Sequence, residues 1–249
     1  MNAATKRNKI GVITVEMLSE LFTNYWLHIV IAVFAAYLIS SVNTSIIVTR
    51  IVKHEDIRKL GSGNAGFTNV LRSIGKVPAI ITIVSDALKC IIAVLIGGFI
   101  FSSISADTQM LQGEFINCGK YVAGIFCILG HSYPVYFHFK GGKGVVAAAA
   151  LMATEDWRVF ILIITTFLIL FFATKIISLS SIICSGLYPI YTFLITFIFD
   201  YLNSDYSVSY VVLSTLATLI IGVFVIVKHK SNIGRLIRGE EKKITAKKK

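Results

Sequence analysis

Two glycine-rich segments of the chain carry the residue types that bind phosphate. In residues 61–76, Gly61, Gly63 and a third glycine at position 66 let backbone N–H groups approach an anion. The segment also contains a guanidinium that can hold a phosphate through two parallel hydrogen bonds, and four neutral hydrogen-bonding side chains. These residues are Arg72, Ser62, Asn64, Thr68 and Asn69. Turn residues alone are typical of an ordinary loop, but this combination favours a phosphate site.

The second glycine-rich segment centres on Lys143, which Gly141 and Gly142 precede and Gly144 follows. Lys143 lies at the predicted start of a helix, where free N–H groups add to its positive charge and form a second anion site. The segment is not a Walker A loop, because Gly144 stands where Ser or Thr is required and position 137 is not glycine. A nucleotide-driven transporter is therefore disfavoured. Lys140 and Lys143 could alternatively anchor the chain at the cytoplasmic membrane surface, although the flanking glycines favour a specific role for Lys143.

Two further polar segments lie beside long apolar runs. Ser178 and Ser181 belong to one of them. In the other, His229, Asn232 and Arg235 share one helix face if the last apolar helix continues beyond the membrane. A basic tail of this kind is often a lipid-surface contact, with each Lys or Arg contributing ~1 kcal/mol near anionic lipid. That alternative does not explain His229 and Asn232.

The composition indicates that these segments belong to a membrane protein. Of 249 residues, 55% are hydrophobic and 15% are charged, and the mean hydropathy is +0.78, which excludes a water-soluble globular protein. The net charge of +11 is concentrated between apolar runs and at the chain ends, so we expect no nucleic-acid partner. The four cysteines form no C-x-x-C pair, and we expect neither a disulfide framework nor a metal or other cofactor.

Seven helical segments are predicted, which makes the chain an all-α polytopic membrane protein. They span residues 27–50, 77–104, 118–138, 144–154, 157–174, 178–199 and 208–228. The fourth segment is too short to cross a bilayer unaided, but its small residues suit a half-buried or re-entrant helix. One of the long segments carries Asp86 and Lys89 one helical turn apart, and we interpret them as a structural ion pair.

Loop charges predict the orientation, because short cytoplasmic loops are enriched in Lys and Arg. Counting all seven segments places the N-terminus outside, the C-terminus in the cytoplasm and all four polar segments on the cytoplasmic face, where we expect one site. Lys6, Arg7 and Lys9 argue against an outside N-terminus, unless residues 17–26 form an amphipathic segment at the membrane surface. We divide the chain into an extension (1–26), a membrane domain (27–240) and a basic cytoplasmic tail (241–249).

The polar segments resemble the motifs of the PlsY family of bacterial membrane acyltransferases, which transfer an acyl group from acyl phosphate to glycerol 3-phosphate. The resemblance extends from about Tyr37 to Glu240 and includes Asp86, Lys89 and the serines at 178–181. The family fold has seven helices, with the N-terminus outside and the C-terminus in the cytoplasm. Phe67 and Ala147 stand where the family usually has alanine and threonine, and a bulky Phe67 would alter the pocket and its substrate preference.

The resemblance implies acyl transfer to the sn-1 hydroxyl of glycerol 3-phosphate, giving lysophosphatidate and inorganic phosphate at the bacterial inner membrane. The chain has no His-x4-Asp dyad to act as a general base, which is compatible with the substrate-assisted proton transfer that the family implies. We assign phosphate binding to Arg72, Lys143 and the Ser62–Asn64 backbone. Asn69 and Asn232 would orient the substrates, and Ser178 or Ser181 would contact the donor. His229 would donate a hydrogen bond to phosphate or act as a base.

The expected partners are glycerol 3-phosphate, acyl phosphate and a bilayer containing anionic lipids. We expect a functional monomer, with the enzyme that makes acyl phosphate as a candidate partner. A second hypothesis is a transporter or channel for a phosphorylated solute, although no convincing inverted repeat is found. A third, a non-catalytic lipid-surface anchor, explains the tail but leaves the glycine-rich segments without a purpose.

Overall fold

The computed structural model describes residues 23–203 and 205–244, and this part of the chain is helical and contains no strands. The longer helices are α2 (Trp26–Ser40), α5 (Lys76–Ser102), α6 (Gln109–Ser132), α8 (Trp157–Thr174), α9 (Ile177–Ile195) and α10 (Val208–Lys228). The shorter ones are α3 (Thr44–Lys53), α4 (Phe67–Ser73), α7 (Val145–Glu155) and α11 (Lys230–Ile237). Short turns lie at Ile57–Lys59 (η1) and Val135–Phe137 (η2), and a π-helical turn at Thr196–Tyr201 (η3) extends α9.

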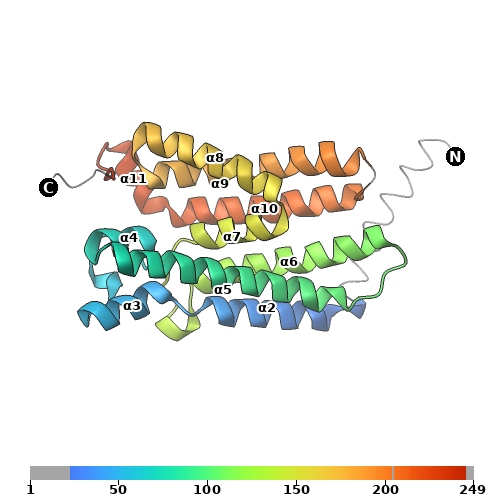
Figure 1. Ribbon diagram of the computed structural model, residues 1–249, viewed down its shortest axis with the longest axis horizontal. Helices are drawn as coiled ribbons and strands as arrows, with labels where there is room; N and C mark the ends of the chain where they lie inside the picture. The colour runs from blue at the N-terminus through green and yellow to red at the C-terminus, as the bar shows by residue number, and fades with distance from the viewer. Residues whose placement is uncertain (1–22, 204, 245–249) are drawn as a thin grey trace.

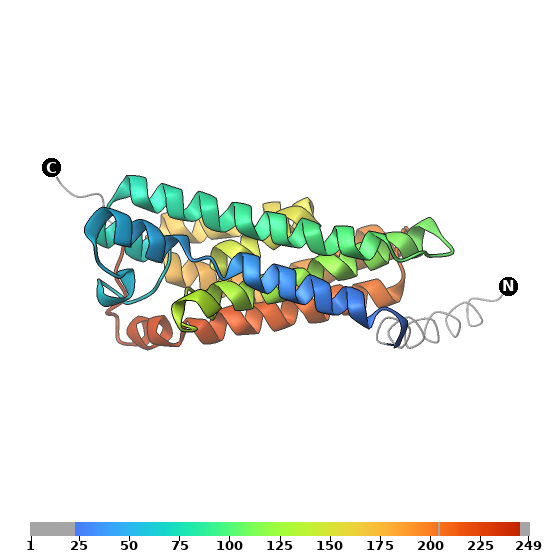
Figure 2. The ribbon, with the colours of Figure 1, turned by 90° about the horizontal axis from the view of Figure 1, so that it is seen from below.

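The long helices form two layers with α7 between them (Figure 1). Helices α2, α5 and α6 pack against one another in one layer, and α8, α9 and α10 form the other. Helix α7 contacts α5, α6 and α8 and so joins the two layers. The short helices α3, α4 and α11 gather at one end of the molecule, as both ribbon views show (Figures 1 and 2). We call this end, with the loops at 54–66 and 133–144, the polar end.

Among the described residues, five helical segments are long and apolar enough to cross a membrane. They are Trp26–Lys53, which comprises α2, α3 and the short break between them, Lys76–Ser102, Trp157–Thr174, Ile177–Tyr201 and Val208–Lys228. Their outer faces carry exposed apolar side chains. On α5 these recur every three or four residues, from Val77 to Leu88 and on to Phe99, as on a helix with one face toward lipid. The prediction of an all-helical membrane protein is therefore confirmed.

The predicted uninterrupted helix at 27–50 is wrong, because the chain breaks between α2 and α3. The side-chain oxygen of Asn43 accepts a hydrogen bond from the backbone N–H of Ile46 at 3.2 Å and caps α3. The break leaves the carbonyl of Val42 outside helical bonding, and Lys89 Nζ donates to it at 2.6 Å. Lys89 also lies 2.8 Å from Asp86, so the predicted ion pair is present and stabilises the break.

The predicted segment at 118–138 is wrong at both ends, because α6 begins at Gln109 and ends at Ser132. Thr108 caps its start by accepting a hydrogen bond from the N–H of Leu111. Hydropathy did not predict the first turns of α6, because they contain polar residues that are nevertheless buried. Glu114, for example, is 2% exposed and accepts hydrogen bonds from Ser207 N at 2.6 Å and Ser207 Oγ at 3.0 Å. At the other end the helix stops just before Pro134.

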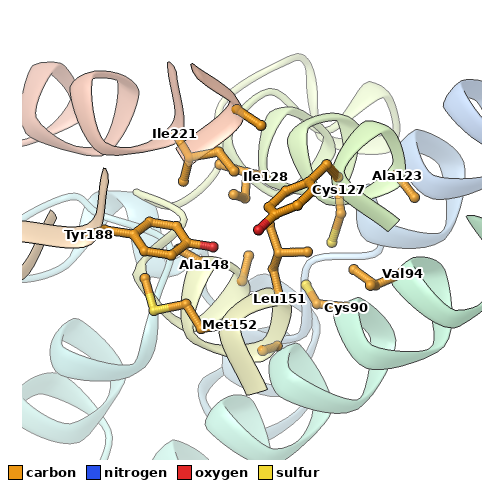
Figure 3. Packing of buried hydrophobic residues seen from close by; sticks show 14 of the residues in the cluster. Cys90, Val94, Ala123, Cys127, Ile128, Ala148, Leu151, Met152, Tyr188 and Ile221 are labelled. Carbon is orange, nitrogen blue, oxygen red and sulfur yellow. The ribbon is translucent and has the colours of Figure 1, made fainter. Parts of the chain in front are cut away.

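Helix α7 is as short as predicted, and its small and medium-sized side chains fill the centre of the molecule. Figure 3 shows Leu151 and Met152 of α7 between Tyr188 of α9 on one side and Cys90 and Cys127 of α5 and α6 on the other. Ala147 lies in the same core and is 1% exposed. Because the core fixes α7 from both sides, it also fixes the loop that precedes α7 and carries Lys143.

Helices α5 and α6 cross in backbone contact, which only small residues permit. A Cβ atom on Gly97 would lie 2.4 Å from the Cβ of Ala123 and 2.5 Å from the carbonyl oxygen of Gly119. Helices α9 and α10 approach in the same way, since a Cβ on Gly222 would lie 2.3 Å from the carbonyl oxygen of Ser185. The two layers are thus tightly packed supports for the polar end. The amphipathic segment predicted at 17–26 lies largely outside the described residues.

Candidate active site

A pocket of about 200 Å³ opens at the polar end. It is lined by Ser62, Gly63, Asn64, Gly141, Lys143, Lys228, Ser231 and Arg235. These residues come from the first glycine-rich loop, the second glycine-rich loop, the end of α10 and α11. Three of the four polar segments predicted to meet therefore do line one pocket, and the fourth reaches it through a hydrogen bond described below.

Asn69 shapes the first loop from behind. Its side chain is 3% exposed, and its Nδ2 donates to the carbonyls of Ile57 at 3.1 Å and Leu60 at 2.9 Å. Its Oδ1 accepts from the backbone N–H of Ser62 at 3.0 Å. Gly61 lies so close to this amide that a Cβ would be 2.3 Å from Oδ1, and its φ of +55° favours glycine. Asn69 and Gly61 therefore position the loop, and the predicted role of Asn69 in orienting the substrates stays a prediction.

Arg58 joins the first loop to the second. Its guanidinium donates to both carboxylate oxygens of Asp56, at 2.9 and 2.7 Å, which fixes its plane. Its NH1 then donates to the carbonyl of Phe137 at 2.7 Å and to that of Lys140 at 3.1 Å. The Arg58 hydrogen bonds hold the pKa of Asp56 well below its usual value, so this carboxylate stays charged. The distance between the two loops is thus set by one arginine.

The glycines of the second loop allow it to lie against the end of α6. The N–H groups of Gly141 and Gly142 donate to the carbonyls of Ser132 and His131, at 3.2 and 3.1 Å. A Cβ on Gly141 would lie 2.1 Å from the carbonyl oxygen of His131, and one on Gly142 would lie 2.1 Å from His131 Nε2. Both glycines were predicted to bind substrate. Gly141 lines the pocket, whereas Gly142 allows the loop to pack against the His131 side chain.

Lys143 is held in the pocket by a chain of polar side chains. Its ammonium donates to Asn232 Oδ1, and Asn232 Nδ2 donates to Glu241 Oε1 at 2.6 Å. Glu241 also accepts from Ser178 Oγ at 2.6 Å and from Arg235 Nε at 2.6 Å. The Ser178 bond connects the start of α9 to the pocket residues. The hydrogen bonds that Glu241 accepts outweigh the effect of its partial burial, and its pKa is lowered.

Lys143 is surrounded by more positive than negative charge. Burial lowers its pKa most, and Arg235, Arg72 and Lys228 lower it further, while Glu241 partly offsets them. The pKa falls from 10.5 to about 8 as a result. The pocket thus holds an excess of positive charge that an anion would relieve.

His229 lies beside this cluster as a buried, neutral imidazole. It is 3% exposed, and burial together with the charge of Lys143 lowers its pKa to about 4. Its Nδ1 lies 2.7 Å from the carbonyl oxygen of Val225, which can only accept, so Nδ1 carries the proton. In the neutral ring Nε2 is then an acceptor. The predicted donation to a phosphate is therefore not available from Nε2 in this state.

The remaining predicted residues lie at the edge of the site or apart from it. Arg72 does not line the pocket; its NH2 donates to the carbonyl of Lys242 at 3.0 Å. Thr68 is partly buried on α4 and is also absent from the lining. Ser181 bonds to the carbonyl of Ile177 in its own helix. Phe67 packs in the apolar cluster under the first loop and is not among the residues that line this pocket, and its effect on substrate preference stays a prediction.

Sequence reasoning missed four residues of the site: Arg58, Lys228, Ser231 and Glu241. Arg58 precedes the first glycine-rich segment and Lys228 ends the last long helix, and these positions give no sign of their contacts. Glu241 belongs to the predicted basic tail (241–249), and the described residues of that tail, Glu241 to Ile244, contact the site or the loop beside it. Besides the bonds of Glu241 and Lys242, the N–H of Ile244 donates to the carbonyl of Lys175 at 2.8 Å.

Known proteins are similar to this chain in sequence and in fold. The sequence model of the glycerol-3-phosphate acyltransferase family matches residues 30–239. A glycerol-3-phosphate acyltransferase of Prochlorococcus marinus (strain MIT 9215) is 34% identical over 215 residues, covering 86% of this chain and 97% of the relative. One from Francisella tularensis subsp. novicida (strain U112) is 38% identical over 210 residues, covering 84% and 89%.

Two crystal structures of PlsY, an integral membrane glycerol 3-phosphate acyltransferase, are similar to most of this chain. The glycerol 3-phosphate form gives a TM-score of 0.69 at 31% identity, covering 87% of this chain and 96% of that one. The lysophosphatidic acid form gives a TM-score of 0.65 at 30% identity, covering 87% and 95%. The resemblance seen in the motifs is therefore confirmed, and the chain belongs to the PlsY family of integral membrane glycerol-3-phosphate acyltransferases.

Proposed function

We propose that the chain transfers a fatty acyl group from acyl phosphate to the sn-1 hydroxyl of glycerol 3-phosphate, the first acylation in phospholipid synthesis. The observation that carries the proposal is the pocket itself. It brings Lys143, Lys228 and Arg235 together with a single carboxylate, that of Glu241, among the described residues around it. Both proposed substrates carry phosphate groups, and the related PlsY structures are glycerol 3-phosphate and lysophosphatidic acid forms.

The reaction requires mainly positioning and charge. The sn-1 oxygen attacks the acyl carbonyl carbon, a new ester C–O bond forms, and the C–O bond to the leaving phosphate breaks. The hydroxyl proton passes to a phosphate oxygen, so lysophosphatidate and inorganic phosphate result. Lys143 would stabilise negative charge on phosphate, and Asn232 aligns its ammonium. Nε2 of His229 would accept the hydrogen bond of the attacking hydroxyl and so orient it.

We further propose that α6 and α7, with the five long apolar helices, complete a seven-helix bundle whose polar end faces the cytoplasm. The polar end carries the basic side chains Arg50, Lys53, Lys59, Lys76 and Lys140, which is typical of a cytoplasmic membrane surface. In a bacterial inner membrane, a monomer would then receive a lipid-tailed donor from the bilayer and glycerol 3-phosphate from the cytoplasm. The enzyme that makes acyl phosphate remains a candidate partner.

Product formation by the purified protein tests the proposal. The protein in detergent would be supplied with labelled glycerol 3-phosphate and one of three donors: acyl phosphate, acyl-CoA or an acyl carrier protein thioester. We expect lysophosphatidate from acyl phosphate alone, and loss of activity in Lys143→Ala. Lys140→Ala is the matched control, because Lys140 is in the same loop but does not line the pocket. Turnover with a thioester but not with acyl phosphate would refute the proposed donor, and full activity of Lys143→Ala would refute the site.

A further inference from the structure

Residues 133–140, which connect α6 to the second glycine-rich loop, expose several large apolar side chains. Val135 is 39% exposed, Tyr136 is 55% exposed and Phe139 is 56% exposed. We call residues 133–140 the aromatic loop. It lies on the side of the bundle, next to the break between α2 and α3 (Figures 1 and 2). An apolar patch of this kind marks a surface that contacts a partner or a membrane.

The backbone of the aromatic loop is hydrogen-bonded by side chains of the bundle. The hydroxyl of Tyr37 on α2 donates to the carbonyl of Tyr133 at 2.8 Å. Arg58 NH1 donates to the carbonyls of Phe137 at 2.7 Å and Lys140 at 3.1 Å. Irregular backbone tolerates apolar surroundings only when the protein satisfies its polar groups, because lipid offers no hydrogen bonds. These three carbonyls therefore do not need water.

The loop turns outward at two consecutive residues with a left-handed backbone conformation. The φ angles of His138 and Phe139 are +58° and +57°, a range that residues other than glycine rarely adopt. The N–H of Phe139 donates to the carbonyl of Pro134 at 3.0 Å and closes the turn. The turn leaves the Phe139 ring more than half exposed, so packing within the described part of the chain does not explain it. Strained turns of this kind cluster in functional segments.

The aromatic loop lies at a depth along the bundle that lipid reaches. The N–H of Val135 donates to Ser41 Oγ at 3.4 Å, beside the carbonyl of Val42 to which Lys89 donates. Toward the polar end from Lys89, α5 keeps exposed apolar side chains as far as Val77, about 18 Å along the helix. Both ribbon views place the aromatic loop at the same level along the long axis as this stretch (Figures 1 and 2). A bilayer that covers α5 as far as Val77 therefore also reaches the loop.

We propose that the aromatic loop inserts into the bilayer leaflet at the polar end, with the rings of Tyr136 and Phe139 among the upper acyl chains. Bilayer lipid is favoured over a protein partner because the loop continues the lipid-facing surface of α2, where Leu38 and Val42 are 41% and 43% exposed. The exposed side chain of Lys140 ends the loop and suits anionic headgroups above the rings. The inference goes beyond the proposed function, because it concerns bilayer lipid and requires no acyl transfer.

Fluorescence quenching by brominated lipids tests the insertion. The two tryptophans of the chain, Trp26 and Trp157, would be replaced by Phe, and single tryptophans would then be introduced as Tyr136→Trp and Phe139→Trp. Each variant would be reconstituted in vesicles of phosphatidylcholine and phosphatidylglycerol, with or without bromine on the acyl-chain carbons nearest the headgroup. We expect both loop variants to lose at least about half of their emission in brominated vesicles, as for side chains at the boundary of headgroups and acyl chains.

Two further single-tryptophan variants are the controls. Ile80→Trp, at a position of α5 that is 57% exposed on its lipid-facing side, should be quenched in brominated vesicles. Glu55→Trp, at an exposed position among charged residues of the polar end, should retain its emission there and be quenched by acrylamide in the aqueous phase. Thermal unfolding would show that each variant is folded, and the second loop position decides the question if the first variant does not fold.

Bromine quenching of the loop tryptophans that is no stronger than that of Glu55→Trp would overturn the proposal. If acrylamide then quenches them, the loop faces water. If neither quencher reaches them, protein covers the loop, as a second copy of this chain would. Failure of lysophosphatidate synthesis is a distinct outcome, because the quenching is measured without substrates.

Discussion

Raising the pH should weaken substrate capture through the deprotonation of Lys143. Its pKa is lowered to about 8, chiefly by burial and then by the charges of Arg235, Arg72 and Lys228, against the opposing effect of Glu241. With that pKa, about 90% of the lysine is protonated at about pH 7 and about 10% at about pH 9. If only the ammonium form binds phosphate, kcat/KM for glycerol 3-phosphate should fall about tenfold over this interval.

The pH dependence of stability distinguishes this loss of activity from unfolding, because the deprotonation of Lys143 changes the two in opposite directions. The folded chain releases the Lys143 proton at a lower pH than the unfolded chain does, because its pKa is lowered from 10.5. Above about pH 8 the unfolded state therefore binds more protons at this residue, and the contribution of Lys143 to the free energy of unfolding rises with pH. Activity should decline while this contribution to stability increases.

The assay is the initial rate at subsaturating glycerol 3-phosphate across about pH 6 to about pH 10, with the spontaneous hydrolysis of the donor subtracted. Lys143→Arg is the matched variant, because a guanidinium remains charged throughout this range. Its activity should be lower but should lack the decline centred near the pKa of about 8. The same decline in Lys143→Arg, or a flat wild-type profile, would show that another group titrates or that the charge of Lys143 is not required.

Three further changes test the geometry of the site. Gly142→Ala should lower thermal stability by about 1–3 kcal/mol, since its Cβ would lie 2.1 Å from His131 Nε2, whereas Gly186→Ala, with open space around it, should not. Arg58→Lys should reduce kcat/KM about tenfold or more, because it loses two hydrogen bonds to carbonyls of about 1 kcal/mol each. Lys59→Arg is the control and should have no effect. Equal activities of Arg58→Lys and the wild-type protein would contradict the role of Arg58. Glu241→Gln should move the alkaline decline to lower pH, because the carboxylate raises the pKa of Lys143, and an unchanged midpoint would refute that coupling.

The periodicity and hydropathy of the sequence correctly predicted those helices whose bounds follow from a continuous run of apolar, membrane-spanning residues. Helices α8 and α10 have the predicted bounds, because continuous apolar residues leave little choice of where they begin and end. The break at Asn43 and the early start of α6 were missed because both depend on tertiary hydrogen bonds. An apolar count cannot show that a lysine from another helix will satisfy the carbonyl of Val42, or that Glu114 will be buried against Ser207.

The site was predictable as far as its residue types indicate chemistry. Lys143, Asn232 and Arg235 meet as expected, because glycine-rich loops and charged residues at helix ends are visible in sequence. The sequence did not show which of these residues line the pocket and which hold its loops in place. Asn69 and the pocket residue Asn64 have the same side chain. Only the positions of the carbonyls of Ile57 and Leu60 show that the Asn69 amide is already hydrogen-bonded to the loop.

The break between α2 and α3 has a mechanical consequence. A membrane helix changes its tilt when the thickness of the bilayer changes. An unbroken rod from Trp26 to Lys53 would carry that tilt directly to η1 and to Arg58, displacing the link between the two loops. The chain instead breaks at Val42 and Asn43, where Lys89 bonds to the freed carbonyl, so a change in the tilt of α2 is not carried rigidly to α3. We therefore expect the geometry of the pocket to depend less on bilayer thickness than it would with an unbroken helix.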